Sequence, residues 1–424
     1  MDFSKFTAIF KSRDLRNKIL FVVAMMVVFR IAANIPIPGI DRSKLIEFFQ
    51  TNQFFGLMNV FTGGALENLS IVMLGLGPYI TGTIIMQLLT LIFPNLKEMY
   101  QESGEQGRRK FNQYARILTV PLAAIQSFAM LRLLQKQGVF GEVTGLNLIV
   151  SIITVTAGSV FLMWIGELIT EKGIGNGISL LIFAGIISGV PSSIRQIILT
   201  WDPSQLPSYV LFFIAAILIT IGVVIVTQAR RNVPVSYAKR VRGNKMYGGV
   251  QTYLPMMINP AGVIPIIFAL SIMMLPGMFG SVFADSSVNW LSTLANFLNN
   301  IFKNSWIYGI CYFILVVLFT YFYTAVTFDP ENIAENLQKM GGFVPGLRPG
   351  KQTADFLRTI LNRVLLVGAV FLGLIAVMPS IIQGITGITS FSFAIGGTSL
   401  LIIVSVVLET SKQIQSQLEM REYE

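Results

Sequence analysis

Ten long apolar stretches with few charged residues constrain the fold of this 424-residue chain more than any other feature. A helix needs about 20 apolar residues to cross a bilayer, and each stretch is close to that length. Lipid offers no hydrogen-bond partners to exposed backbone groups, so helices must carry nearly all of these segments. The sequence therefore predicts an all-α polytopic membrane protein, with spans near residues 18–35, 71–93, 115–134, 147–169, 174–190, 208–228, 259–280, 304–326, 361–382 and 391–410.

Composition supports this class and argues against an enzyme. Only 12% of the residues are charged, against about a quarter in soluble domains. The chain has no histidine and one cysteine, Cys311, which argues against a His/Cys metal site, a Cys–His nucleophile and a disulfide framework. A serine–lysine or two-aspartate membrane protease stays formally open, although the spans contain no aspartate pair. We expect no enzymatic activity, metal or cofactor, and without a GxxxxGK[ST] loop any ATP-driven motor must be another protein.

Basic residues are distributed unequally between the two sets of loops. Twenty-four lysines and arginines fall in the two termini and in the loops after spans 2, 4, 6 and 8, whereas five fall in the other loops. Cytoplasmic segments carry such an excess, so we expect both termini in the cytoplasm. The formal net charge of +10 is then mostly a topology signal and does not require nucleic-acid binding.

The ten spans divide into two sets of five, which we assign to residues 1–190 and 191–424. An odd-numbered half that is duplicated must be inserted upside down relative to its twin, as in many transport proteins. "GLGPYI" in span 2 and "GVIPIIF" in span 7 place a glycine and a proline at corresponding positions. The similarity is loose, but it favours two inverted halves.

Two cytoplasmic loops are too long to be simple connections. Residues 229–257 hold six basic and no acidic residues, and the alternation around "GNKMYGG" predicts a hairpin with a Gly-rich turn. In residues 328–359, Asp329 as N-cap, Pro330 in the first turn and Gly341 as the stop predict a short helix. The loops either hold topology beside anionic lipid or dock a cytosolic partner, such as ribosomal RNA or an acidic protein surface.

Five ordered motifs carry a family resemblance that runs from "LRNKILF" almost to the end of the chain. They are "ENLSIVMLGLGPYITGTIIMQLL", "ITEKGIGNGISLLIFAGI", "NPAGVIPIIFALSI", "GFVPGLRPGKQT" and "FSFAIGGTSLLIIV". Together they resemble the bacterial SecY family, the channel subunit of the protein-conducting translocon. The resemblance implies ten helices in two inverted five-helix halves around an hourglass pore. It also implies a SecE partner, often SecG, and unfolded secretory polypeptide with its signal sequence as the substrate, driven by the SecA ATPase or the ribosome.

The resemblance also implies positions for a pore ring and a plug. A narrow ring of branched apolar side chains dewets when empty and deforms around a passing chain. Motif positions place the ring at Leu76, Ile80, Ile178, Ile182, Ile267 and Ile402, and the two pairs four residues apart each share a helix face. The plug would be the segment just before span 2, which is too short to cross: Gly56, Leu57, Met58, Asn59, Val60, Phe61, Thr62, Gly63, Gly64, Ala65, Leu66, Glu67 and Asn68.

Polar residues in spans 2, 3 and 7 are the candidates for a lateral gate, the seam through which apolar segments leave for lipid. Unsatisfied polar groups facing lipid are costly, so hydrogen bonds across this seam would make its closure reversible. The candidates are Thr83, Gln87, Gln126, Asn259 and Ser271, and the static alternative is that they simply hold helices together. For binding of SecA or the ribosome, the family's basic loops point to Arg240, Arg242, Lys245, Arg348 and Lys351.

Three kinds of function remain after these observations. The first is a protein-conducting channel of the bacterial inner membrane, in contact with lipid on all sides. The alternative is a secondary transporter with broken helices, which normally needs charged residues near the middle of its spans. The third is a membrane scaffold whose basic loops bind a partner without transport. The near absence of charges in the spans and the apolar ring favour the channel.

Overall fold

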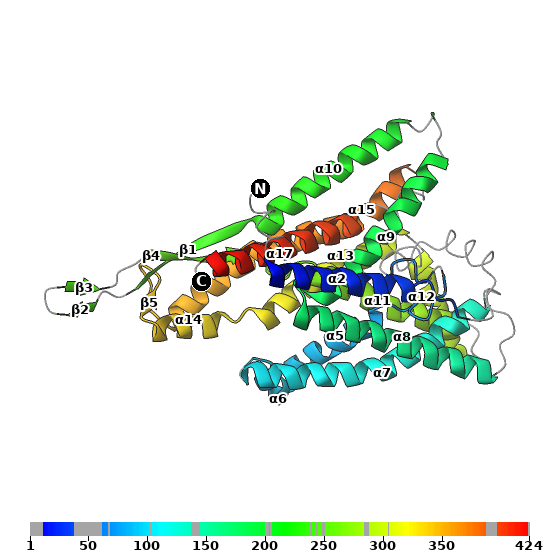
Figure 1. Cartoon of the computed structure of the whole chain (residues 1–424), viewed down its shortest axis with the longest axis horizontal. Helices are drawn as coiled ribbons and strands as arrows, with labels where there is room; N and C mark the ends of the chain where they lie inside the picture. Colours follow the sequence, from blue (N-terminus) through cyan, green and yellow to red (C-terminus); the bar gives the residue numbers. More distant parts are fainter. Residues whose placement is uncertain are drawn as a thin grey trace.

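The computed structural model describes residues 12–37, 62–66, 68–101, 103–136, 145–199, 203, 206–237, 240–242, 245–247, 251–283, 288–303, 305–386 and 397–422. Within these ranges the chain is mainly helical, and ten helices coincide with the ten predicted spans (Figure 1). They are α2 (Arg13–Ala32), α5 (Gly77–Ile92), α7 (Gly104–Lys136), α8 (Gly145–Lys172), α9 (Gly177–Leu199), α10 (Leu206–Gln228), α11 (Ile264–Phe283), α13 (Ser305–Thr327), α15 (Lys351–Thr386) and α17 (Gly397–Glu422).

The described helices differ in whether each is long and apolar enough to cross a membrane. Four segments are long and apolar enough to cross a membrane by themselves: Gly104–Gln135, Gly145–Lys172, Trp306–Lys339 and Lys351–Met378. A fifth would be α5 together with α6 (Pro94–Gln101), although the two bend by 114° at their break. The apolar parts of α9, α10 and α11 are shorter, and α2 carries charged residues at both ends.

Span 2 begins later than the sequence predicted. Residues 71–76 form turns, with Gly75 at a φ of +56°, and α5 starts only at Gly77. A span over residues 71–93 would place Pro78 in the helix interior, where it interrupts the hydrogen-bond ladder. Instead it lies in the first turn of α5, where a helix has no partner for the missing N–H. Leu76 is therefore the N-cap residue of α5 rather than part of its interior.

The turn between α8 and α9 explains why the "GIGNG" sequence is needed there. The Asn176 side-chain oxygen accepts hydrogen bonds from the backbone N–H groups of Ile178, at 3.1 Å, and Ser179, at 3.3 Å. These bonds satisfy N–H groups that have no partner at the start of a helix. A Cβ atom on Gly177 would lie only 2.0 Å from the carbonyl oxygen of Gly166, so this approach of α9 to α8 requires glycine.

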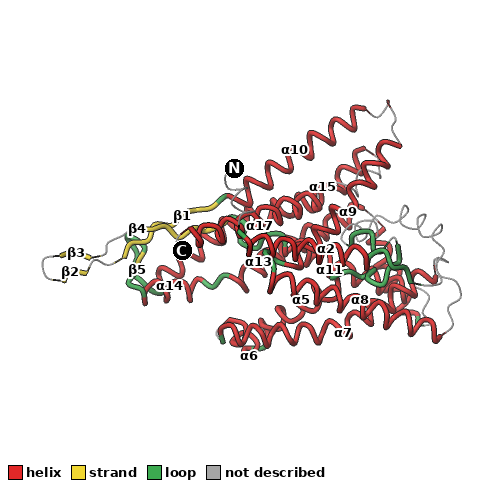
Figure 2. Tube along the Cα trace, in the orientation of Figure 1, coloured by secondary structure: helices red, strands yellow, loops and turns green. Residues whose placement is uncertain are grey.

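The predicted hairpin in loop 229–257 is present and projects from one end of the helices (Figure 2). Its two strand pairs share one antiparallel register, from Arg230 opposite Met257 to Arg242 opposite Lys245. Lys245–Tyr247 is a strand, whereas we had assigned it to the turn. The four strands are β1 (Arg230–Tyr237), β2 (Arg240–Arg242), β3 (Lys245–Tyr247) and β4 (Gln251–Met257).

The predicted helix in the second loop is α14 (Pro330–Lys339), and its capping agrees with the sequence. The Asp329 carboxylate accepts hydrogen bonds from the backbone N–H groups of Glu331, at 2.9 Å, and Asn332, at 3.3 Å. Gly341, with a φ of +74°, follows the last turn, where a left-handed residue commonly ends a helix.

The two long loops form one unit, which the sequence did not predict. β5 (Gly342–Phe343) pairs antiparallel with the end of β1, giving a sheet of order β4-β1-β5. Val233 of β1, Val344 after β5 and Leu357 of α15 are buried in the same small hydrophobic cluster. The base of the hairpin is thereby packed on α15. A further helix, α12 (Asn289–Lys303), lies at the opposite end of the molecule (Figure 1).

Candidate pore, plug and gate

The six residues predicted for the pore ring lie in one hydrophobic cluster. Five of them are at most 8% exposed, and Ile178 is half-buried and packs against the others. They lie on four helices: α5 with its N-cap residue, α9, α11 and α17. α5 packs against α11 and α9 packs against α17, so both contacts join the first five spans to the last five. Leu76, Ile80, Ile182, Ile267 and Ile402 belong to the main hydrophobic core of the molecule, which also includes many other residues, and Ile178 packs against that core.

The described part of the predicted plug is packed beside this cluster. Thr62, Ala65 and Leu66 are almost completely buried, and Ala65 belongs to the same cluster as the ring residues. Residues 56–61 and Glu67, the rest of the predicted plug, lie outside the described residues. The segment continues through Asn68, whose side-chain amide donates to that of Asn34 at 3.4 Å.

Arg30, near the end of α2, connects the plug segment to α9. Its Nη1 atom donates to the carbonyl oxygen of Gly63 at 2.6 Å and to the hydroxyl of Ser188 at 3.0 Å. Arg30 is thus hydrogen-bonded near the end of its span, and one of its partners is a backbone carbonyl of the predicted plug.

The plug also approaches α9 through two glycines. A Cβ atom on Gly63 would lie 2.8 Å from the Cα atom of Gly185 and 3.2 Å from the ring of Phe29. Gly63 and Gly64 both have positive φ, at +69° and +77°, but a Cβ atom on Gly64 would meet nothing within 4 Å. The backbone conformation therefore favours glycine at both positions, whereas close packing requires it only at Gly63.

The predicted gate residues lie where α5, α7 and α11 meet, because α11 packs against both of the others. Gln87 and Gln126 are buried, and so is Asn259, which precedes α11. The side-chain oxygens of all three have no hydrogen-bond partner among the described residues. The Asn259 amide nitrogen donates locally, to the carbonyl oxygen of Gly262 at 3.0 Å. The place where these helices meet thus contains buried acceptors without described partners.

Hydroxyl groups at this seam bond within their own helices. Thr83 donates to the carbonyl oxygen of Tyr79 at 3.0 Å, and Ser271 donates to that of Ile267 at 2.9 Å. We had expected side-chain bonds across the seam. Both hydroxyls instead use the carbonyl four residues earlier, which is the local acceptor that helix geometry offers to Ser and Thr.

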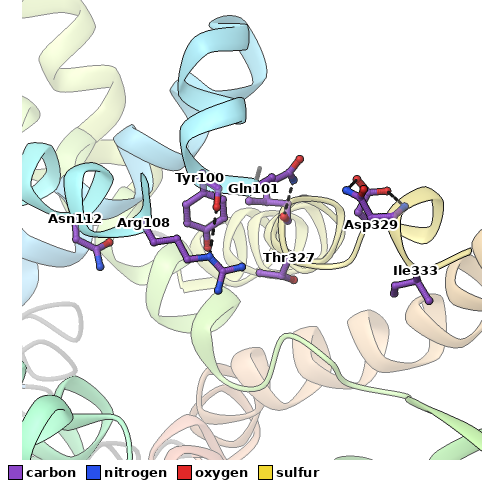
Figure 3. A pocket seen from close by; sticks show the side chains of 9 residues that line it. Tyr100, Gln101, Arg108, Asn112, Thr327, Asp329 and Ile333 are labelled. Carbon is purple, nitrogen blue, oxygen red and sulfur yellow. Dashed lines mark hydrogen bonds between the residues drawn. The ribbon is translucent and has the colours of Figure 1, made fainter. Parts of the chain in front are cut away.

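A hydrogen bond joins α6 to α13 at a residue that the sequence analysis did not single out. Gln101, at the end of α6, donates from Nε2 to the backbone carbonyl of Val326 on α13, at 3.0 Å (Figure 3). No motif marks Gln101, and the two residues are 225 positions apart. The bond lies at a cavity of about 530 Å³ between α6, α7, α13 and α14. The cavity is lined by Tyr100, Gln101, Arg108, Asn112, Val326, Thr327, Asp329, Asn332 and Ile333.

The predicted partner-binding residues lie on the unit formed by the two long loops. Arg348 and Lys351 are exposed. The backbone of Arg348 is held by Gln352, which accepts from its N–H at 3.3 Å, and by Thr353, which donates to its carbonyl at 3.0 Å. Its guanidinium has no ion pair among the described residues. Arg240, Arg242 and Lys245 lie in β2 and β3, but their side chains are outside the described part of the structure.

The described side chains offer little for redox or metal chemistry. Cys311 is a free, half-buried thiol in α13. Within the described ranges, no three Cys, Asp or Glu side chains are grouped so that they could hold a metal ion.

Comparison with protein families decides the classification. The SecY family model matches residues 70–411, which is most of the chain. The chain belongs to the SecY family. The protein translocase subunit SecY of Corynebacterium glutamicum is 43% identical, and the match covers 98% of this chain and 98% of that protein. The corresponding subunit of Thermus thermophilus is also 43% identical, with 97% and 94% covered.

Solved channel structures share this fold at low sequence identity. A structure of a protein-conducting channel superimposes with a TM-score of 0.65 at 19% identity, covering 94% of this chain and 91% of that chain. Sec61 in the canine ribosome–channel complex gives a TM-score of 0.62 at 19% identity, with the same coverage. The chain is therefore an all-α polytopic membrane protein with the ten-helix architecture of the SecY family, as the sequence predicted.

Proposed function

We propose that this SecY-family chain is a protein-conducting channel of the bacterial inner membrane. It passes unfolded secretory polypeptides across the bilayer and releases apolar segments sideways into lipid. The observation that supports this most directly is that five predicted ring residues from both halves of the chain are buried in the main hydrophobic core, together with Ala65 of the plug segment. A site for a small solute would need fixed polar groups, whereas a passage for chains of any sequence needs walls without them.

The ring seals the resting channel. Branched apolar side chains from four helices exclude water from the narrowest point, because an apolar constriction dewets. Such side chains make no directional bonds, so they move aside for a passing chain and close behind it. Contacts between α5 and α11 and between α9 and α17 support a seal between residues 1–190 and 191–424, which we assign to two inverted halves. Separation of the halves then widens the ring.

The plug reinforces the seal, and its attachment is reversible. Arg30 and Ser188 hold the Gly63 carbonyl, while Ala65 contributes to the ring's own cluster. The hydrogen bonds of one arginine, together with a short buried segment, are weak enough for an entering polypeptide to displace.

Closure of the gate is reversible as well. Gln87, Gln126 and Asn259 have buried acceptors without described partners, so a hydrated or occupied seam would gain hydrogen bonds that the closed seam lacks.

The unit formed by the two long loops is the cytoplasmic docking platform. Its hairpin and its Arg348 loop are fixed to each other through β1 and β5, so a partner that binds either one exerts force on α15. We assign Arg240, Arg242, Lys245, Arg348 and Lys351 to contacts with the SecA ATPase or the ribosome. SecE and SecG complete the membrane complex. Both chain termini then lie in the cytoplasm, at the platform's side of the membrane.

The interactions of the charged residues near the spans argue against a secondary transporter. Arg30 is engaged by Gly63 and Ser188, and Arg116 pairs with Glu167 at 2.5 Å. These groups are therefore already neutralised or hydrogen-bonded and are not free to coordinate a solute.

Reconstitution tests this function. The purified chain with SecE and SecG is placed in lipid vesicles, and SecA, ATP and a secretory precursor are added. We expect the precursor to become protected from external protease only when its signal sequence is intact and ATP is present. ATP hydrolysis should require SecA. Protection that does not depend on the signal sequence, or ATP hydrolysis by the chain alone, would contradict the proposal.

A further inference from the structure

α12 connects α11 to α13 at the end of the molecule opposite the β1–β4 hairpin, and it packs against both helices (Figure 1). It is 15 residues long, which is too short to cross a bilayer. Its sequence, "NWLSTLANFLNNIFK", combines large apolar residues with four asparagines. The ring, plug, gate and platform assigned above do not include this helix.

The helix has three distinct faces at 3.6 residues per turn. One face is turned to the protein and includes Ala295, which is fully buried. A second face is apolar but directed outward: Trp290 is 67% exposed, Phe297 is 62% exposed, and Leu294 lies between them. The third face is polar and exposed, and consists of Asn289, Thr293 and Asn296. The outward apolar face lies between the buried face and the polar face.

This order of faces fits a helix at the boundary of three media. The buried face meets protein, the polar face suits water, and the apolar face between them requires a third, apolar neighbour. Three large apolar side chains on one exposed face are not expected in contact with water. A tryptophan with an asparagine beside it is typical of the headgroup region, where Trp rings place an apolar body in lipid and an N–H near water.

The neighbouring helix shows which medium this is. α13 exposes an apolar stripe of its own that begins at Trp306 and continues through Ile310, Ile314 and Leu318. Because α13 is long and apolar enough to span a membrane, we expect this exposed stripe to face lipid. α12 packs against α13. Lipid that surrounds α13 would therefore also reach the outward apolar face of α12.

We infer that α12 is an interfacial anchor, which buries Trp290, Leu294 and Phe297 in the headgroup and acyl-chain boundary of the bilayer leaflet opposite the cytoplasmic platform. The ligand is the lipid surface itself. Since α12 packs against α11 and α13, the anchor fixes the depth of these two helices in the membrane. α11 is the helix that meets α5 and α7 at the gate, so a fixed α11 gives the gate a stationary side.

Tryptophan quenching in vesicles tests this inference. The chain has four tryptophans, so replacing Trp164, Trp201 and Trp306 by phenylalanine leaves Trp290 as the sole reporter. The full chain is reconstituted with its partner subunits in phosphatidylethanolamine–phosphatidylglycerol vesicles that contain lipids brominated either near the headgroup or near the chain terminus. We expect shallow bromines to quench Trp290 roughly twofold more than deep ones, as for an indole at the interface.

Two further variants make the test independent of any one substitution. In a background without tryptophan, Phe297→Trp places the reporter elsewhere on the apolar face and should behave like Trp290. Thr293→Trp places it on the polar face and should be quenched by aqueous iodide rather than by brominated lipid. Quenching of Trp290 and of F297W by iodide alone would overturn the inference, because the face would then meet water. Resistance of both to either quencher would also overturn it, because a protein would then cover the face.

Discussion

Arg30 and Gly63 are joined by a 2.6 Å hydrogen bond between the Nη1 atom of the arginine and the carbonyl oxygen of the glycine. The same guanidinium nitrogen reaches Ser188 on α9. A charged side chain near the end of one span thus holds the backbone of the predicted plug segment against α9. The same helix carries Ile182 of the predicted ring.

Loss of this bond should loosen the plug. Arg30→Met keeps an extended apolar stem but removes the donors, and hydrogen bonds to a charged group contribute about 1.5–3 kcal/mol. We expect ion leakage through the idle channel, and export of precursors with defective signal sequences, to rise roughly tenfold. Conductance in planar bilayers and a secretion assay measure these two effects. Arg132→Met is the matched control, because Arg132 bonds within its own helix, to Gln135. Equal behaviour of the two variants would remove Arg30 from the plug's attachment.

Gly63 and Gly64 offer a second test, because both have a positive φ but only Gly63 lacks room for a Cβ atom. Alanine at either position is strained by the positive φ, at a cost of about 1–2 kcal/mol. Only at Gly63 would the new Cβ also collide with the backbone of Gly185. Gly63→Ala should therefore displace the plug and raise ion leakage well above that of Gly64→Ala, in the same conductance measurement. If the two alanine variants leak equally, the close packing against α9 is not what holds the segment.

Gln101 should stabilise the closed gate. Gln101→Met retains the length of the side chain and removes its donor to Val326, which weakens closure by about 1 kcal/mol. A cysteine pair across the gate, in a chain without Cys311, should then form its disulfide more slowly in the idle channel. Gln113→Met serves as the control, because Gln113 is exposed on α7. An unchanged rate in Gln101→Met would show that the bond does not contribute to closure.

Arg348 should serve a partner rather than the fold. Its guanidinium has no described ion pair, whereas Arg358 of α15 pairs with Glu331 of α14 at 2.8 Å. Arg348→Glu is therefore expected to lower SecA-driven translocation severalfold while leaving thermal stability unchanged. Arg358→Glu should instead lower the melting temperature slightly, because exposed pairs contribute about 0.2–1 kcal/mol. Loss of stability in Arg348→Glu, with translocation per folded channel intact, would contradict this assignment.

Local signals in the sequence predicted much of this structure. Apolar length located the ten spans, and Asp329, Pro330 and Gly341 predicted both ends of α14. The alternation in loop 229–257 predicted its hairpin. These features depend on residues near one another in the chain, so periodicity and capping rules apply to them directly.

Features that depend on distant contacts were missed or misplaced. Pairing of β5 with β1 joins two loops that have no complementary pattern, and Gln101 meets a backbone carbonyl, which leaves no trace in side-chain identity. Pro78 was assigned to the interior of a span because apolar residues precede it, although those residues form turns packed against α8. The pore ring came from family resemblance, since an isoleucine in a span usually packs or faces lipid.

Disulfide trapping of a translocating chain tests the central claim most directly. Cys311 is replaced, single cysteines are placed at Ile80, Ile182, Ile267 and Ile402, and a secretory precursor with one cysteine is stalled partway through the membrane. A cysteine at Ile310, on the lipid-facing stripe of α13, is the control. The account predicts crosslinks at all four ring positions and none at the control. A correctly stalled precursor that forms no crosslink at any ring position would contradict a polypeptide path through this cluster.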